Sequence, residues 1–144
     1  AIPILINYIK STDNLIGRKR TLHILKKIPT FEKSILVDEL MGNTSADEKK
    51  RIIEALHDFA DIDITDCLRY FLRHHSADIR KAMIDLIIKR QAEKTVDLVL
   101  EILKDKKTDE NIDIIKDAIF ALGNMKAKKA VPYLIKLIKK ICYC

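Results

Sequence analysis

The segment Ala1-Ile2-Pro3-Ile4-Leu5-Ile6-Asn7-Tyr8-Ile9-Lys10 recurs near the end of the chain as Ala130-Val131-Pro132-Tyr133-Leu134-Ile135-Lys136-Leu137-Ile138-Lys139. The two segments match position by position, and each has the apolar spacing of an amphipathic helix. Self-similarity across a chain indicates stacked structural repeats that share one continuous core. The sequence therefore predicts a helical array that begins and ends on the same element of its repeat.

Composition supports long amphipathic helices. Of the 144 residues, 48% are hydrophobic and 33% are charged, while only three Gly and three Pro are available for turns. No apolar run approaches the roughly 20 residues that span a bilayer, and the N-terminal segment lacks the basic start of a signal peptide. Three cysteines do not make a disulfide framework. We therefore expect a cytoplasmic protein with no membrane span.

Two kinds of helix alternate along the chain. The second kind has a leading apolar residue at Leu5, Leu36, Leu68, Val99 and Leu134. The first kind has a position occupied by Thr21, Ile52, Ala82 and Ala118, followed four residues later by Leu25, Leu56, Leu86 and Leu122. Both series lengthen at the charged segment 104–111, which predicts a longer loop there. The prediction is a single domain over 1–144, with a lone second helix over 1–12 and helix pairs over 13–43, 44–75, 76–108 and 109–144.

Several residues predict where helices begin and end. Ser45-Ala46-Asp47-Glu48 has the pattern of a capping box. Gly42 and Gly123 follow apolar periodic segments and are expected to form left-handed C-terminal caps. Pro3 and Pro132 are expected in the first turn of a helix, where a missing N–H costs nothing.

Two segments resemble the HEAT repeat family, in particular its short PBS-lyase type. Asp78–Leu86 is similar to the family pattern Asp-x-x-Arg-x-x-Ala-x-x-x-Leu with one residue displaced, and Ala118–Gly123 followed by Ala130–Ile135 is closer. Thr21 and Ile52 stand where the family has a small residue. The resemblance implies an all-α, right-handed α-solenoid (an α-α superhelix) of antiparallel helix pairs, with about four and a half repeats. The family's signature residues are structural, so the resemblance implies no activity.

The surface of the second helices is the candidate binding site. In a HEAT-like solenoid, the residues two and five positions after each leading apolar residue would face the concave side. Tyr70 and Arg73 are the best anchors, because aromatic residues and arginine are frequent at interface hot spots. We predict a protein–protein interaction scaffold whose partner is not identified by the sequence. The predicted partner-binding residues are Asn7, Asp38, Tyr70, Arg73, Glu101, Lys104, Lys136 and Lys139.

Charge gives an alternative. The net charge is +6 with an isoelectric point near 9.2, and four of five residues in one surface row are cations (the row is Lys10, Met41, Arg73, Lys104 and Lys139). Such a ladder could bind nucleic acid or an acidic partner. The same cations also lie in the last helical turn, where they complement the helix dipole in any protein. A second set of cations on the first helices is expected to pair with acids of neighbouring repeats, such as Asp47, Asp78 and Asp113. These cations are Lys19, Lys50, Arg80 and Lys116.

Evidence for catalysis is thin. No phosphate-binding loop and no nucleophile motif is present, so we predict no catalytic residue, no metal site and no cofactor. A HEAT-like enzyme, such as a relative of bilin lyases or DNA glycosylases, is kept as an alternative. Cys142 and Cys144 could supply two zinc ligands, but no second ligand pair accompanies them.

The ends of the predicted array carry apolar residues, among them Ile135, Ile138, Ile141 and Tyr143. Uncapped ends of a solenoid are adhesive. We expect that the chain is an excerpt of a longer array, and the alternative is end-to-end self-association.

Overall fold

The structure is a computed structural model that describes residues 1–105 and 111–142, with the side chains of residues 141 and 142 excepted. Within these ranges the chain is all-helical, with nine α-helices, one short 3-10 helix and no strand. The helices are α1 (Ile2–Ser11), α2 (Leu15–Lys27), α3 (Ser34–Met41), α4 (Ala46–Leu56), α5 (Thr65–Phe71), α6 (Ala77–Arg90), α7 (Glu93–Lys104), α8 (Ile112–Asn124), η2 (Lys128–Ala130) and α9 (Val131–Cys142).

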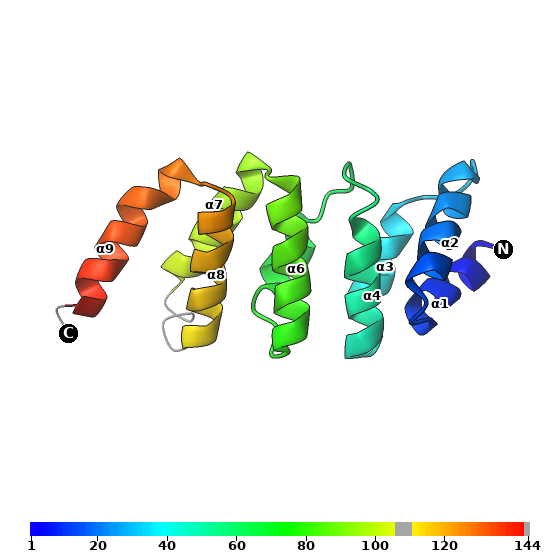
Figure 1. Ribbon diagram of the computed structural model, residues 1–144, viewed down its shortest axis with the longest axis horizontal. Coiled ribbons are helices and arrows are strands. Elements are labelled where there is room, and N and C mark those ends of the chain that lie inside the picture. The colour runs from blue at the N-terminus through cyan, green and yellow to red at the C-terminus, as the bar shows by residue number, and fades with distance from the viewer. Residues whose placement is uncertain (106–110, 143–144) are drawn as a thin grey trace.

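The even-numbered helices lie side by side along the long axis of the molecule. Figure 1 shows α2, α4, α6 and α8 in one row, and each packs against the next. Helices α3 and α7 lie behind this row, with α3 packed on α4 and α7 packed on α8 (Figure 1). Helix α1 packs on both α2 and α4, and α5 packs on α6 and α7. The two ends of the chain are therefore far apart, at opposite ends of the row.

The core lies between the even-numbered and odd-numbered helices. The four leucines Leu25, Leu56, Leu86 and Leu122 are all buried, as their spacing predicts, and so are Leu36, Leu68 and Val99. Leu5 and Leu134, at the two ends of the same series, are only half-buried. Near them, Tyr8 on α1 and Ile138 on α9 are exposed.

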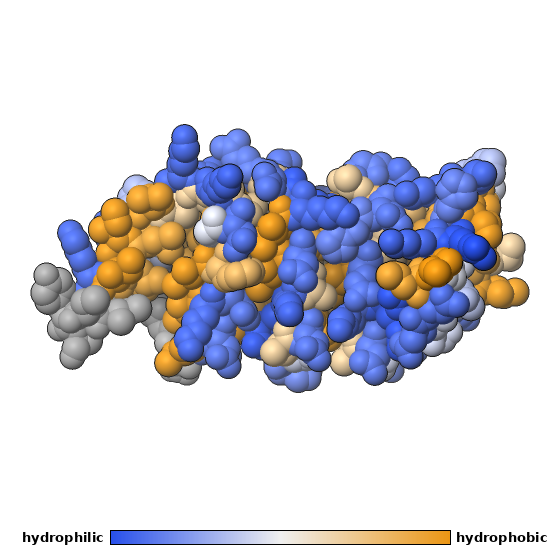
Figure 2. Space-filling model, in the orientation of Figure 1, coloured by the Kyte–Doolittle hydropathy of each residue, from blue (hydrophilic) through white to orange (hydrophobic). Residues whose placement is uncertain are grey.

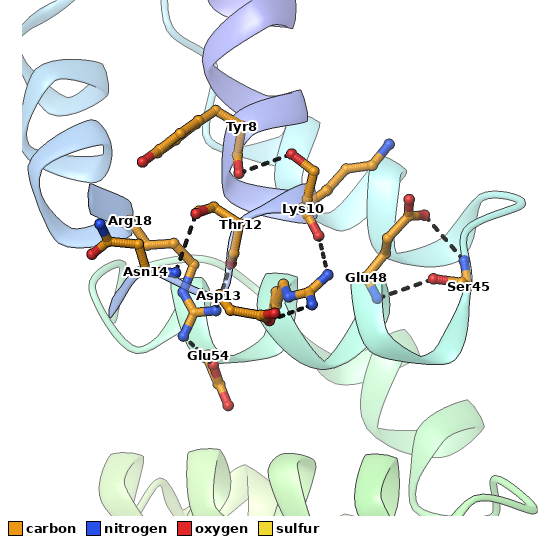
Figure 3. A network of polar contacts seen from close by, with 11 residues as sticks. Tyr8, Lys10, Thr12, Asp13, Asn14, Arg18, Ser45, Glu48 and Glu54 are labelled. Carbon is orange, nitrogen blue, oxygen red and sulfur yellow. Dashed lines mark hydrogen bonds and ion pairs between the residues drawn. The ribbon is translucent and has the colours of Figure 1, made fainter. Parts of the chain in front are cut away.

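The predicted helix starts agree with the structure. The Ser45 hydroxyl accepts a hydrogen bond from the Glu48 N–H at 3.2 Å, and the Glu48 carboxylate accepts one from the Ser45 N–H at 3.1 Å (Figure 3). This is the capping box at the start of α4. Pro3 and Pro132 both lie in the first turn of their helices.

The predicted glycine caps are wrong. Gly42 ends α3 in an extended conformation, with φ −79° and ψ −171°. The Lys49 ammonium donates to the carbonyls of Leu40 and Gly42, both at 2.8 Å, so a side chain satisfies groups that a left-handed turn would otherwise satisfy. Gly123 lies inside α8, and the left-handed residue that follows this helix is Lys126, with φ 51°.

A recurrent cation closes the turn between an odd-numbered helix and the next even-numbered one. Arg18 donates to the Thr12 carbonyl at 3.1 Å, Lys49 donates to the two carbonyls named above, and Arg80 donates to the His74 carbonyl at 2.8 Å. Each lies four residues after the N-cap residue of its helix. These N-cap residues are Asn14, Ser45 and Ser76. We call Arg18, Lys49 and Arg80 the turn cations.

Two turn cations also bridge neighbouring even-numbered helices. Arg18 on α2 pairs with Glu54 on α4 at 2.9 Å (Figure 3), and Arg80 on α6 pairs with Asp117 on α8 at 2.7 Å. Of the cations expected to pair between repeats, Arg80 does so, and its partner is Asp117 rather than Asp47, Asp78 or Asp113.

The predicted register of these cations is off by one in two repeats. Among the described residues, Lys19, Lys50 and Lys116 make no hydrogen bond or ion pair, whereas Arg80 does. A shift of one residue along a helix changes the direction of the side chain by about 100°. The shifted side chain therefore points away from the helix–helix contact and toward solvent. The predicted loop over 104–111 includes residues 106–110, which lie outside the described ranges.

Candidate functional site

The eight predicted binding residues are all exposed, and all belong to odd-numbered helices or to the residue positions that follow them. Asn7 lies on α1, Asp38 on α3, Tyr70 on α5, Arg73 just after α5, Glu101 and Lys104 on α7, and Lys136 and Lys139 on α9. We call this set the odd-helix face. Its centre is formed by α5 and α7, which pack against each other and bring Tyr70, Arg73, Glu101 and Lys104 to neighbouring positions. Asn7, Asp38, Lys136 and Lys139 are spread toward its two ends.

Two charged residues at the centre of the odd-helix face, Arg73 and Glu101, are paired across helices. Arg73 pairs with Asp105 at 2.9 Å, and Glu101 pairs with Arg69 at 3.6 Å. Near the N-terminus, Lys10 on α1 pairs with Glu39 on α3 at 2.8 Å. The central surface is therefore polar and largely self-neutralised.

These pairs bear on the predicted cation ladder. Lys10 and Arg73 are held by carboxylates, and the Lys104 ammonium lies 5.6 Å from the centre of the Tyr133 ring. A phosphate backbone would have to compete with these contacts for each cation. The sequence contained a signal for one partner, because Glu39 occupies a position that is apolar in the other second helices.

Tyr70 is an exposed aromatic side chain at the centre of this face, with 58% of its surface accessible. Its ring meets the buried ring of Phe71 edge-on at 4.9 Å. Phe71 stacks on His74 at 5.8 Å, and His74 stacks on His75 at 4.3 Å. Tyr70 is thus the outer member of an aromatic group that is anchored in the core by Phe71.

The His74 ring is fixed by its backbone contact. Its Nδ1 atom accepts a hydrogen bond from the Ser76 N–H at 3.0 Å, so this nitrogen carries no proton. Burial lowers the pKa of His74, and the nearby charges of His75, Lys49 and Arg80 lower it further. At neutral pH, His74 therefore adds an uncharged ring beside Tyr70.

A pocket of about 390 Å³ opens where the α4–α5 connection meets the end of α6 and the start of α7. Apolar side chains, including Ile64, Leu68 and Leu98, line much of it, together with the cations Lys89 and Lys94 and the acid Asp63. This combination could hold a small molecule with an apolar body and a negative group. Sequence reasoning missed the pocket, because its lining comes from two separate stretches, 57–68 and 86–98, that share no motif.

Arg90 forms part of this pocket and organises the α4–α5 connection. Its guanidinium donates to the carbonyls of Ile62 at 2.6 Å, Phe59 at 2.8 Å and Leu56 at 3.3 Å. Its buried Nε atom has no hydrogen-bond partner. Burial lowers the pKa of Arg90 and the pKa of the neighbouring His57. The positive charge of Lys89 also lowers the pKa of His57. Since three backbone carbonyls accept hydrogen bonds from the guanidinium, its role in the described structure is to hold the α4–α5 connection.

The described residues offer no obvious reactive centre. They contain no group of three His, Cys, Asp or Glu side chains arranged for a metal ion. Burial raises the pKa of the Cys67 thiol to about 11, which keeps it protonated and unreactive. The predicted zinc half-site at Cys142 and Cys144 lies outside the side chains that the structure describes. In the same described ranges, no helix is both long enough and apolar enough to cross a membrane.

Comparison with known proteins adds no relative. No protein-family model matches the sequence, and no curated protein matches it either.

Proposed function

We propose that the chain is a protein-interaction scaffold with a HEAT-like, right-handed α-solenoid fold, and that it binds a protein partner through the odd-helix face. Three observations support the fold proposal: the row of even-numbered helices, the packing of odd-numbered helices on it, and the recurrence of α1 as α9. Arrays of this kind use extended surfaces made by equivalent helices of successive repeats for binding.

The observation that carries the functional proposal is the setting of Tyr70. An exposed tyrosine held at the base by the buried Phe71 loses little conformational entropy when a partner covers it. The surrounding ion pairs are already formed, so a partner would not have to compensate unpaired charges there. A central aromatic anchor with a polar surround is the usual composition of a protein interface.

The odd-helix face can be tested by crosslinking in a native lysate. A photoreactive phenylalanine derivative is placed at Tyr70, and in a control protein at Ile24, which is comparably exposed on α2 in the other row of helices. We expect a discrete protein adduct from the Tyr70 position that is absent from the Ile24 position.

The crosslinked partner then allows a quantitative test. Tyr70→Ala is expected to weaken its binding by about 2 kcal/mol, the lower bound for a hot-spot residue, while Ile24→Ala leaves affinity unchanged. Circular dichroism checks that both variants keep their helicity. Equal affinity of the Tyr70→Ala variant and the unaltered chain would remove the odd-helix face from consideration.

A further inference from the structure

Helix α9 carries an uncovered apolar stripe. Val131, Ile135 and Ile138 lie one helical turn apart on one side, and Ile135 and Ile138 keep 48% and 59% of their surface accessible. Figure 2 shows the corresponding apolar surface gathered over α9, at the end of the molecule beyond α8. The other side of α9 is held to the body, since the Tyr133 hydroxyl donates to the Leu103 carbonyl at 2.8 Å.

Helix α1 has a similar sequence to α9, and it shows how helices can cover such a stripe. Ile6 and Ile9 match Ile135 and Ile138, but only 3% and 0% of their surface is accessible. Helices α2 and α4 cover them. Within the described ranges, Ile135 and Ile138 have no such cover and stay exposed, while Tyr133 on another side of α9 contacts α7. The same residue types at the same positions are therefore buried by a helix at one end of the molecule and exposed at the other.

The equivalence also extends to charge. Lys10 matches Lys139, and on α1 this lysine pairs with the carboxylate of Glu39 from a neighbouring helix at 2.8 Å. Lys136 and Lys139 follow one another on the same flank of the α9 stripe, and neither has an ion pair among the described residues. Helix α9 contains no acidic residue. Two lysines without an ion pair in the described part of the chain, beside an apolar stripe, favour a covering helix that supplies carboxylates, as Glu39 of α3 does for Lys10.

A second copy of the chain is a poor occupant, because the α2 and α4 surfaces that cover α1 are already occupied by its own α1. Helix α2, whose sequence LIGRKRTLHILKK has basic residues and no acid, would also bring its cations against Lys136 and Lys139. Like charges across an interface are costly.

We propose that the α9 face, formed by Val131, Ile135, Ile138, Lys136 and Lys139, binds an acidic amphipathic α-helix of a partner protein. The partner's apolar side covers the stripe as α2 covers Ile6 and Ile9, and its carboxylates pair with the two lysines. This is the helix-in-groove mode of recognition, with charge selecting the partner. The α9 face shares Lys136 and Lys139 with the odd-helix face but does not include Tyr70, the anchor proposed for that face.

The test uses two synthetic helices that differ only in charge. Both have the sequence of residues 13–28, which keeps the apolar positions of α2. In the acidic peptide, the residues replaced by Glu are Arg18, Lys19, Arg20, Lys26 and Lys27, and the control peptide keeps the native basic sequence. Fluorescence anisotropy with the full chain should show the acidic peptide binding at least about tenfold more tightly at low salt. The difference should shrink as salt is raised, because salt screens exposed charges.

Variants of the full chain assign the binding to the α9 face. Ile135→Ser with Ile138→Ser should weaken the acidic peptide by about tenfold or more, since both side chains lose their apolar contact. Lys136→Glu with Lys139→Glu should reverse the preference between the two peptides. Tyr70→Ala is the control and should leave peptide binding unchanged, so failure here and failure of the odd-helix face are separate results.

Three results would overturn the proposal. The first is equal binding of the two peptides, which would show that charge does not select the partner. The second is the absence of binding by the acidic peptide at any salt concentration. The third is an oligomer of the unaltered chain in sedimentation that becomes monomeric with the Ile135→Ser and Ile138→Ser substitutions, because the face would then be occupied by a second copy.

Discussion

At the residue scale, three backbone carbonyls in and before the α4–α5 connection accept hydrogen bonds from one side chain, Arg90. Replacement of Arg90 by Ala removes all three hydrogen bonds, so the Ile62 carbonyl loses this donor, while the Leu56 and Phe59 carbonyls keep only a backbone N–H donor outside helix α4. We expect the free energy of unfolding to fall by about 2–4 kcal/mol, because hydrogen bonds to a charged group contribute more than neutral ones. Urea denaturation followed by circular dichroism measures the change.

The matched control is Arg69→Ala on the surface of α5. Its guanidinium contacts Glu101 at 3.6 Å and both side chains are exposed, so its loss should cost less than about 0.5 kcal/mol. A loss of stability in Arg90→Ala no larger than in Arg69→Ala would show that the connection does not depend on this side chain.

For the candidate site, the exposure of residues could be predicted from the sequence, but their ion pairs and hydrogen bonds could not. Exposure of Tyr70 and Glu101 follows from their spacing relative to buried leucines, because helical period alone fixes which side faces solvent. The pairing of Arg73 with Asp105 does not follow, since the carboxylate lies at the cap of another helix and its position depends on how α5 and α7 pack. The hydrogen bonds of Arg90 could not be predicted either, because they join the end of a helix to an irregular segment.

At the scale of the helix, α8 contains a glycine whose side-chain position is empty. A Cβ atom at Gly123 would meet nothing within 4 Å, and no glycine in the described ranges has a positive φ. Gly123→Ala should therefore raise the free energy of unfolding by about 0.5 kcal/mol, since alanine loses less backbone entropy in a helix. Thermal unfolding detects such a change as a higher Tm.

Gly42→Ala is the control for this substitution. Gly42 lies outside the helix, and an added Cβ would be 3.3 Å from the Asp38 carbonyl oxygen, so no gain is expected. An unchanged or lower Tm for Gly123→Ala would contradict the prediction.

The same two glycines show why helix existence was easier to predict than helix ends. Apolar spacing and the Ser45 capping box gave the helices of the described chain, because those signals act within a few residues. The ends at Gly42 and Gly123 were wrong, since a more distant side chain, Lys49, caps α3, and α8 continues to Asn124. The arrangement of the helices as an array rested on the likeness of α1 and α9, which a local reading of either segment would not show.

At the scale of the whole molecule, packing is deepest in the middle and shallowest at α9. Helix α6 buries residues on most of its circumference and packs on α4, α5 and α8, whereas the described side chains of α9 are exposed or half-buried. Local opening is easier where few buried contacts must be broken. We expect backbone amides of α9 to exchange with deuterium at least about tenfold faster than those of α6 under native conditions.

Hydrogen–deuterium exchange with mass spectrometry measures both helices in one sample, and peptides from α4 serve as an internal reference for the central region. Equal protection of α9 and α6 would show that the chain opens only as one cooperative unit, and would contradict the predicted gradient.

The turn cations have a consequence for the order in which the molecule is built. Arg18, Lys49 and Arg80 bind carbonyls between five and nine residues earlier in the chain. Every such turn can close once a short stretch has left the ribosome, without waiting for distant segments. Structures dominated by near neighbours in sequence fold rapidly, and synthesis proceeds from the N-terminus. The molecule is therefore suited to assemble helix by helix during translation, so that each newly made helix docks on a surface that is already in place.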